Sequence, residues 1–161
     1  MRGQILTLQA PDPIAFAPYG HLVMPPDEPG KRQFYSDALH TRHVASAPVL
    51  HVNHVLPSTL PIEVSGIERH PHAAQCFFPI DVARYVVMVC PSVADGLPRL
   101  DEALAFLMPG TMGVIFNPGV WHLGATVLDR RGHFTVLMWR GGPQQDDDFR
   151  TIAPVTLVAP A

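Results

Sequence analysis

Apolar residues occur in short runs that proline, glycine and aspartate interrupt. In residues 49–55 the pattern alternates, with Leu50 and Val52 on one face and His51 and Asn53 on the other, as in a half-buried strand. The runs that predict strands are 2–9, 49–55, 62–70, 75–80, 84–90, 111–116, 120–128 and 132–140. Many short strands with regular turns between them favour an all-β domain, either a jelly roll or a barrel.

Two segments predict helices, and the longer one is expected on the outside of the sheets. A single turn is expected at 12–16, where Asp-Pro opens the segment and Pro18 and Gly20 end it. A longer helix is expected over 98–107, because leucines recur there at helical spacing, at Leu100, Leu104 and Leu107. The fold would then contain one or two short helices.

The end of the chain turns apolar after a polar stretch. Residues 152–159 predict a final edge strand or a segment that reaches a partner subunit. Because such an edge can pair with a second copy, we expect a homodimer.

Composition indicates one folded domain over residues 1–161. The chain is 47% hydrophobic and only 16% charged, whereas disordered chains combine low hydrophobicity with high net charge. Lysine and arginine number 11 against 14 acidic residues, a net charge of −3. This balance excludes nucleic acid as an expected partner, because it cannot neutralise a run of phosphates.

The expected location is the cytoplasm, with no membrane segment. Residues 1–10 lack the apolar run of a secretory signal. The longest apolar stretch, 112–128, is interrupted by Asn117, Pro118 and His122, so it cannot cross a bilayer as a helix. Cys76 and Cys90 each lie in an apolar run and are expected to be buried thiols in a reducing compartment.

The first cluster with chemical potential surrounds residues 67–75. Glu68 and His70 are two residues apart on a predicted strand, so they share one face, while Arg69 projects from the other. Gln75 follows the turn at Pro71 and can return to the same pocket on the next strand. A carboxylate and an imidazole on one face can hold a cation or share a proton.

The second cluster is Asn117 to His122, where Gly119 makes a turn and His122 lies in the following strand. The two clusters together have the two-motif spacing of a cupin, which makes the expected fold a cupin-like jelly-roll β-barrel. The four ligand places of a metal cupin fall on Glu68, His70, Gln75 and His122. This set suits a borderline divalent ion better than structural zinc.

Other histidines and the tryptophans are interpreted differently. His72 gives an alternative register, His70-x-His72, and is otherwise an exposed turn residue. Trp121 and Trp139 are expected to pack in the core, although Trp121 lies next to the site and is also a candidate for substrate contact. Surface or hydrogen-bonded strand positions are expected for His21, His40, His43, His51, His54 and His133.

The motifs resemble those of the ureidoglycolate lyase family, formerly called ureidoglycolate hydrolase, a cupin family of allantoin breakdown. The resemblance rests on Glu68-Arg69-His70-Pro71 with Gln75, on Gly119-Val120-Trp121-His122, and on Arg140-Gly141-Gly142 with Asp146. The opening segment, residues 14–20, also matches. The family usually continues Trp-His with His-Pro, where this chain has Leu123-Gly124. Apolar residues also replace polar ones at Ala74, Ile115 and Trp139, which predicts a less polar pocket.

The resemblance implies a carbon–nitrogen lyase of the amidine-lyase type that cleaves ureidoglycolate to glyoxylate and urea. His122 or His70 would be the base, and Glu68 would orient the imidazole or bind a metal, for which the resemblance implies nickel. Arg140 or Arg69 would hold the substrate carboxylate.

Two alternatives remain open at this point. The departures from the family pattern also fit a cupin enzyme that acts on another small hydroxy or keto acid. A cupin that binds a small molecule without catalysis is the third hypothesis.

Overall fold

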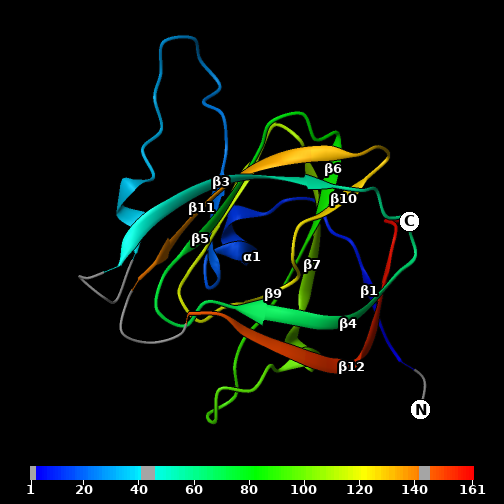
Figure 1. The fold of residues 1–161 in the computed structure, drawn as a ribbon. Helices are drawn as coiled ribbons and strands as arrows, with labels where there is room; N and C mark the ends of the chain where they lie inside the picture. The colour runs from blue at the N-terminus through cyan, green and yellow to red at the C-terminus, as the bar shows by residue number, and fades with distance from the viewer. Residues whose placement is uncertain (1–2, 41–45, 142–145) are drawn as a thin grey trace.

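The computed structural model describes residues 3–40, 46–141 and 146–161, so the expectation for His43 lies outside the described residues. Two β-sheets face each other, with β4 and β12 along the bottom of the view in Figure 1. The seven-stranded sheet has the order β1-β12-β4-β9-β6-β10, and β7 pairs with β6. Its strands are β1 (Gln4–Thr7), β4 (Ile62–Arg69), β6 (Arg84–Cys90), β7 (Leu104–Pro109), β9 (Trp121–His122), β10 (Thr126–Leu128) and β12 (Asp148–Val158).

The five-stranded sheet has the order β2-β8-β5-β11-β3. Its strands are β2 (Gly20–Val23), β3 (Ala47–Val55), β5 (Gln75–Pro79), β8 (Gly113–Phe116) and β11 (Gly132–Arg140). The predicted all-β, cupin-like jelly roll is therefore confirmed. The predicted run 120–128 is divided between β9 and β10.

The main core lies between the sheets and draws buried residues from both of them, among them Val87, Phe106, Phe77 and Phe134. Strand alternation explains this arrangement. In β11, Phe134, Val136 and Met138 are buried, while the residues between them are only partly so, because successive side chains point to opposite faces. A smaller apolar cluster lies outside each sheet.

The predicted helical turn is confirmed as α1 (Pro13–Phe16). The Asp12 carboxylate accepts hydrogen bonds from the amides of Ile14 and Ala15, at 2.9 and 3.2 Å. It therefore caps backbone donors that have no partner within the helix.

The predicted helix over 98–107 is wrong. Only Leu100–Glu102 forms a 3-10 turn, and Leu104 begins strand β7, which pairs with β6 from Val89 to Arg84. Periodicity cannot separate a helix from a strand in so short an apolar run. The free edge of β6 decides between them here, because pairing satisfies the backbone groups of both segments.

The expectation of an apolar edge strand at the end of the chain is also wrong. Strand β12 is paired on both sides, parallel with β1 and antiparallel with β4. The segment from which a homodimer was inferred is therefore not available for pairing. Strand β1 takes the edge position in its place.

Cys76 and Cys90 are free and buried, as expected. No helix among the described residues is long and apolar enough to cross a membrane.

Candidate active site

A cavity of about 230 Å³ opens where β4 and β5 approach each other. Its lining includes Glu68, His70, Gln75 and Arg140, together with residues of β3, β11 and β12. A larger hollow of about 670 Å³ lies under residues 24–35 and contains none of the predicted site residues. The smaller cavity is therefore the candidate site, because it contains the predicted residues although its volume is lower.

His122 lies behind the lining of this cavity, in contact with the lining residues Gln75 and Glu68. Strand β9 places it directly opposite Glu68 of β4 and Val89 of β6, and its side chain is only 1% exposed. The Phe116 ring stacks on the imidazole, with centroids 4.0 Å apart and planes at 9°. This stacking restricts rotation of the ring.

The hydrogen bonds of His122 define which nitrogen faces the site. Nδ1 lies 2.9 Å from the carbonyl oxygen of Val120, and a carbonyl only accepts, so Nδ1 carries a hydrogen. Nε2 then faces Oε1 of Gln75 at 2.8 Å and Oε1 of Glu68 at 3.5 Å. Both are acceptor oxygens in this orientation of the Gln75 amide, so a proton or a cation fits between the three atoms.

His70 follows the end of β4 and faces His122, with ring centroids 5.7 Å apart. Its Nδ1 donates to the backbone carbonyl of Asp146 at 2.7 Å, and the Asp147 carboxylate lies 3.2 Å away. Its buried Nε2 has no hydrogen-bond partner within the described part of the chain. Since Nδ1 carries the hydrogen, Nε2 presents an unused lone pair.

These side chains form a set of electron-pair donors. One ligand atom from each of Glu68, His70 and His122 lies within 4.8 Å of the other two, and Oε1 of Gln75 is adjacent. Backbone carbonyls orient both imidazoles through Nδ1, which is the usual outer-shell arrangement of metal-binding histidines. The donor set therefore fits a divalent cation.

The Glu68 carboxyl is held in its charged form. Burial alone would raise its pKa, but the hydrogen bond with His122 and the charges of His122 and His70 together lower the pKa from its ordinary value. A carboxylate in this position can bind a cation or stabilise a protonated imidazole.

Arg140, at the end of β11, is at the open side of the cavity. Its side chain is 59% exposed, and Nη2 lies 3.9 Å from the Asp147 carboxylate. This distance makes a loose ion pair, so the guanidinium can reach an anion that enters the cavity.

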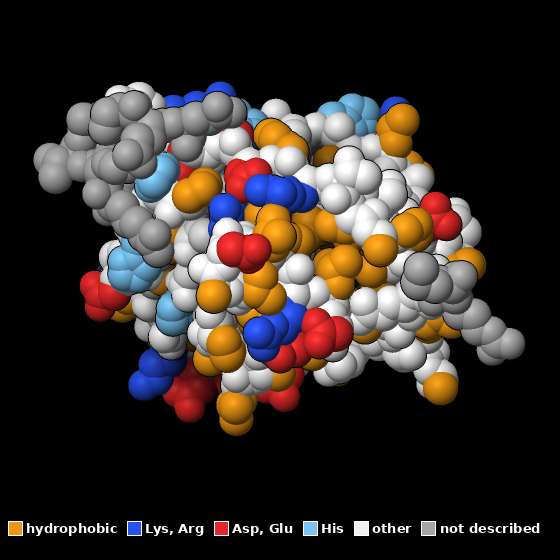
Figure 2. Space-filling view, turned by 90° about the horizontal axis from the view of Figure 1, so that it is seen from below, with side chains coloured by type: hydrophobic (Ala, Val, Ile, Leu, Met, Phe, Trp, Pro, Cys, Tyr) orange, Lys and Arg blue, Asp and Glu red, His pale blue; other side chains and the backbone are white. Residues whose placement is uncertain are grey.

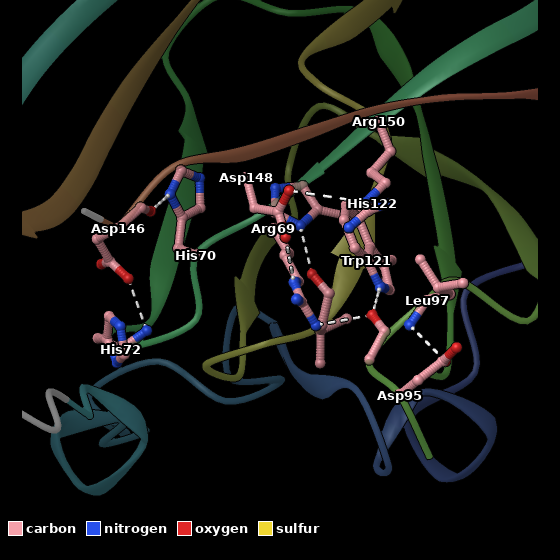
Figure 3. A network of polar contacts seen from close by, with 12 residues as sticks. Arg69, His70, His72, Asp95, Leu97, Trp121, His122, Asp146, Asp148 and Arg150 are labelled. Atoms are coloured by element: carbon pink, nitrogen blue, oxygen red, sulfur yellow. Dashed lines mark hydrogen bonds and ion pairs between the residues drawn. The ribbon is translucent and has the colours of Figure 1, made fainter. Parts of the chain in front are cut away.

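Arg69 and Trp121 lie on the opposite side of the strands, as strand parity predicts for Arg69. Arg69 donates to Asp148 and to the Gly96 carbonyl, both at 2.9 Å, and its guanidinium lies 4.5 Å from the centre of the Trp121 ring. Figure 3 shows Arg69 linked to Asp148, apart from His70, which is linked to Asp146. Neither residue is among the described residues that line the cavity.

This opposite side is shown in Figure 2, where basic and acidic side chains lie beside one another among apolar ones. Arg150 is 3.8 Å from Asp148 and 6.0 Å from the Trp121 ring. Arg69 and Arg150 are thus arranged around the same tryptophan and aspartate, which is a structural network.

The cavity residues that were not predicted as such include two polar side chains of β3, His51 and Asn53. The alternation in residues 49–55 contains the signal, because it places both polar side chains on one face. Asn53 Oδ1 accepts a hydrogen bond from the Phe134 amide at 3.3 Å, which leaves the side-chain amide nitrogen of Asn53 to donate to another group.

Other histidines lie outside the cavity lining. His54 stacks on His133 with ring centroids 4.5 Å apart, and His133 binds Asp81 at 2.8 Å. His72 is held through its backbone amide by Asp146 at 2.6 Å.

The family model described as ureidoglycolate lyase matches residues 4–157. The chain belongs to the ureidoglycolate lyase family. It is 35% identical over 144 residues to the ureidoglycolate lyase of Burkholderia cepacia, which covers 83% of this chain and 78% of that protein. It is 29% identical over 160 residues to that of Azotobacter vinelandii, with 91% and 92% covered. The match to the Schizosaccharomyces pombe enzyme is 30% over 89 residues, which is 53% of this chain and 47% of that protein.

The four apolar departures from the ureidoglycolate lyase pattern lie outside the cavity. Ala74, Ile115 and Trp139 belong to the apolar cluster outside the five-stranded sheet. Leu123 packs against the cluster outside the other sheet, because it follows inward-facing His122 and points the opposite way. The expectation of a less polar cavity rested on these positions and so loses its basis.

Proposed function

We propose that this protein cleaves ureidoglycolate to glyoxylate and urea, as a carbon–nitrogen lyase of the amidine-lyase type. The observation that carries the proposal is the convergence of four side chains: Glu68, His70 and Gln75 line one cavity, and buried His122 contacts them from behind it. Membership of the ureidoglycolate lyase family supports the choice of substrate.

The reaction needs proton transfer and no protein nucleophile. The substrate carries a hydroxyl and a ureido nitrogen on one carbon. When the hydroxyl loses its proton, the oxygen electrons form the aldehyde carbonyl, the carbon–nitrogen bond breaks, and the departing urea nitrogen takes up a proton. General acid and base groups therefore suffice, each contributing about 10²- to 10⁴-fold.

His70 is suited to accept the hydroxyl proton. Its Nε2 is buried and has no hydrogen-bond partner among residues 3–40, 46–141 and 146–161. It presents a lone pair, because Nδ1 donates to the Asp146 carbonyl. His122 lies 3.5 Å from the Glu68 carboxylate, and such a pair can supply the second proton to the leaving nitrogen.

Arg140 is the best candidate to bind the substrate carboxylate. It is the arginine among the described cavity residues, and a guanidinium can hold a carboxylate through two parallel hydrogen bonds. Asn53, on the neighbouring strand β3, offers an amide nitrogen that can donate to the ureido carbonyl.

A divalent cation would be held by Glu68, His70, His122 and Gln75, whose donor atoms fit it. When bound, it would lower the pKa of the substrate hydroxyl and so take over the work of the base. Arg140 and Asn53 would orient the substrate in the same way with or without it.

Another small hydroxy or keto acid is the second candidate substrate. The location of Ala74, Ile115, Leu123 and Trp139 outside the cavity argues against it, because the lining that meets the substrate is unaffected by these replacements. The proposal includes a cytoplasmic location, which the two buried free thiols support.

The test is release of urea and glyoxylate from racemic ureidoglycolate, combined with metal analysis of the purified protein. We expect one urea per glyoxylate, and loss of turnover in His70→Asn and His122→Asn. His21→Asn is the matched control, because His21 is an exposed residue of β2. A bound ion without turnover would support the second substrate class. The absence of both a bound ion and turnover would support a non-catalytic binding protein.

A further inference from the structure

A second hollow adjoins the candidate site. It measures about 310 Å³, and its lining shares Glu68 and Phe149 with the cavity of about 230 Å³. From there it continues along the neighbouring strands β4 and β12 (Figure 1) to Gly66 and Thr151. In the ladder between these strands, Phe149 is opposite Glu68, and Thr151 is opposite Gly66. Cross-strand partners share a face of the sheet, so the second hollow extends the site on the side of Glu68.

Two glycines leave this hollow open. Neither Gly66 nor Gly124 has a positive φ, so the backbone does not require glycine at either position. A Cβ on Gly66 would lie 3.6 Å from the carbonyl oxygen of Arg150, and a Cβ on Gly124 would lie 3.7 Å from the nearest side-chain oxygen. Both are ordinary contact distances. The extra residues of the nearby register shift lie in β12, after Thr151, so a bulge does not account for Gly66.

Glycine inside a strand weakens the strand and often marks a place where a ligand approaches the backbone closely. Gly66 is an interior residue of β4 and is exposed. A larger side chain at this position would occupy the second hollow. We therefore interpret the open space beside Glu68 as room for a part of the substrate.

The lining of the second hollow favours an uncharged group. Its charged residues in the described chain are Glu68 and Arg150. The Arg150 guanidinium turns to the other side of the strands, where it lies 3.8 Å from Asp148 and 6.0 Å from the Trp121 ring. Phe149 is 70% exposed at the junction of the two hollows. An apolar group bound against this ring would remove apolar surface from water, which is favourable.

The roles assigned above orient the substrate towards this hollow. Arg140, which would bind the carboxylate, lines the cavity and is not among the described residues that line the second hollow. Glu68, which with His122 would serve the leaving nitrogen, lines both. The group attached to the leaving nitrogen therefore extends past Glu68, from the cavity into the second hollow.

We propose that the second hollow binds an uncharged, apolar substituent on the far nitrogen of the ureido group. The substrate class then includes N′-alkyl ureidoglycolates. This inference rests on the proposed function and extends its substrate class. The chemistry is the same: the hydroxyl loses its proton, the oxygen electrons form the carbonyl of glyoxylate, the carbon–nitrogen bond breaks, and the nitrogen of the departing alkylurea takes up a proton.

The experiment compares N′-butyl ureidoglycolate with ureidoglycolate by the release of glyoxylate, which both would yield. We expect kcat/KM of the wild type to be about tenfold higher for the butyl substrate, the effect of burying roughly two methylene groups. The ratio of the two kcat/KM values is the quantity that is compared between variants.

Two variants fill the second hollow from different strands, Gly66→Val from β4 and Thr151→Phe from β12. Each should lower the ratio by about tenfold or more, because the butyl group then has no space. Thermal unfolding verifies that each variant is folded, and either one suffices if the other is not. Ser65→Val is the matched control, because Ser65 is the exposed neighbour of Gly66 and its side chain points to the opposite face.

The outcomes separate this inference from the proposed function. Cleavage of ureidoglycolate alone, an unchanged ratio in the folded variants, or an equal fall in Ser65→Val would overturn the second subsite and leave the lyase activity standing. Cleavage of neither substrate would overturn the proposed function. Titration calorimetry with butylurea, the expected product, then tests the hollow by itself. Binding about tenfold weaker in Gly66→Val than in the wild type would support the subsite, and equal or absent binding would overturn it.

Discussion

Nε2 of His122 lies 2.8 Å from Oε1 of Gln75, and this contact joins the two sheets at the site. His122 belongs to β9 of the seven-stranded sheet and Gln75 to β5 of the five-stranded sheet. Because Nδ1 of His122 already donates to Val120, the neutral imidazole would face the amide oxygen with a lone pair. A proton on Nε2, a shared cation, or the Gln75 amide turned so that its nitrogen donates would each satisfy this contact.

Replacing Gln75 by leucine should remove the amide group that contacts His122, while the leucine side chain still fills the volume beside it. We expect kcat/KM for ureidoglycolate to fall by about 10²-fold or more, because His122 then has only Glu68 to hold a proton or cation. The measurement is urea release, together with the metal content of each preparation. Gln33→Leu, at an exposed position, is the matched control. Full activity in Gln75→Leu would contradict the assigned role.

Replacing Arg140 by glutamine should weaken substrate binding. A hydrogen bond to a charged group contributes about 1.5–3 kcal/mol, so KM should rise by roughly 10- to 100-fold with a smaller change in kcat. Initial rates over a range of ureidoglycolate concentrations separate the two constants.

Two variants serve as controls for this result. Arg130→Gln removes an exposed arginine outside the cavity and should leave KM unchanged. Arg69→Gln should mainly lower stability, because Arg69 holds Asp148 and Gly96. A rise in KM for Arg69→Gln alone would assign carboxylate binding to Arg69 instead of Arg140.

The sequence predicts the fold well where alternating apolar residues and turn residues mark a strand locally. Alternation and turn residues locate β6 and β11 closely, since each lies between clear breakers. The pattern fails in 98–107, where leucine spacing fits both a helix and a strand. It also fails in β12, because its parallel partner β1 lies at the far end of the chain.

The sequence also predicts much of the candidate site. The motif spacing indicates Glu68, His70, Gln75 and His122, and the structure brings all four together. It does not indicate His51 and Asn53, because alternation shows that they share a face but not which face turns inward. That choice depends on the pairing of β3 with β11.

Stability at low pH provides a test away from the site. Arg84 binds Asp129 through two hydrogen bonds of 2.7 Å, and the bonds with Arg84 lower the pKa of Asp129. A lowered pKa stabilises the fold above the ordinary aspartate pKa of about 3.9, and this contribution is lost as the pH falls through the lowered value.

Asp129→Asn isolates this ion pair. Asparagine tolerates the positive φ of 67° at this position, so backbone strain is not added. The wild type should have the larger free energy of unfolding near neutral pH, and the difference should disappear in acid. Urea unfolding of both proteins at several pH values measures this difference in the free energy of unfolding. A difference independent of pH would show that the charge of Asp129 does not stabilise the fold.

The two buried thiols give a prediction for alkaline pH. Burial raises the pKa of Cys76 and of Cys90 to about 12, compared with about 8.5 for a free thiol. At pH 8 the folded protein should hold roughly 10³-fold less thiolate than the unfolded chain, so iodoacetamide should label both residues only on unfolding. Because the folded state favours the protonated thiol, the free energy of unfolding should fall as the pH rises above the free-thiol pKa towards 12.

Cys76→Ala and Cys90→Ala assign the labelling rate of each thiol. Rapid labelling of either one in the native protein would show that its side chain reaches solvent without unfolding.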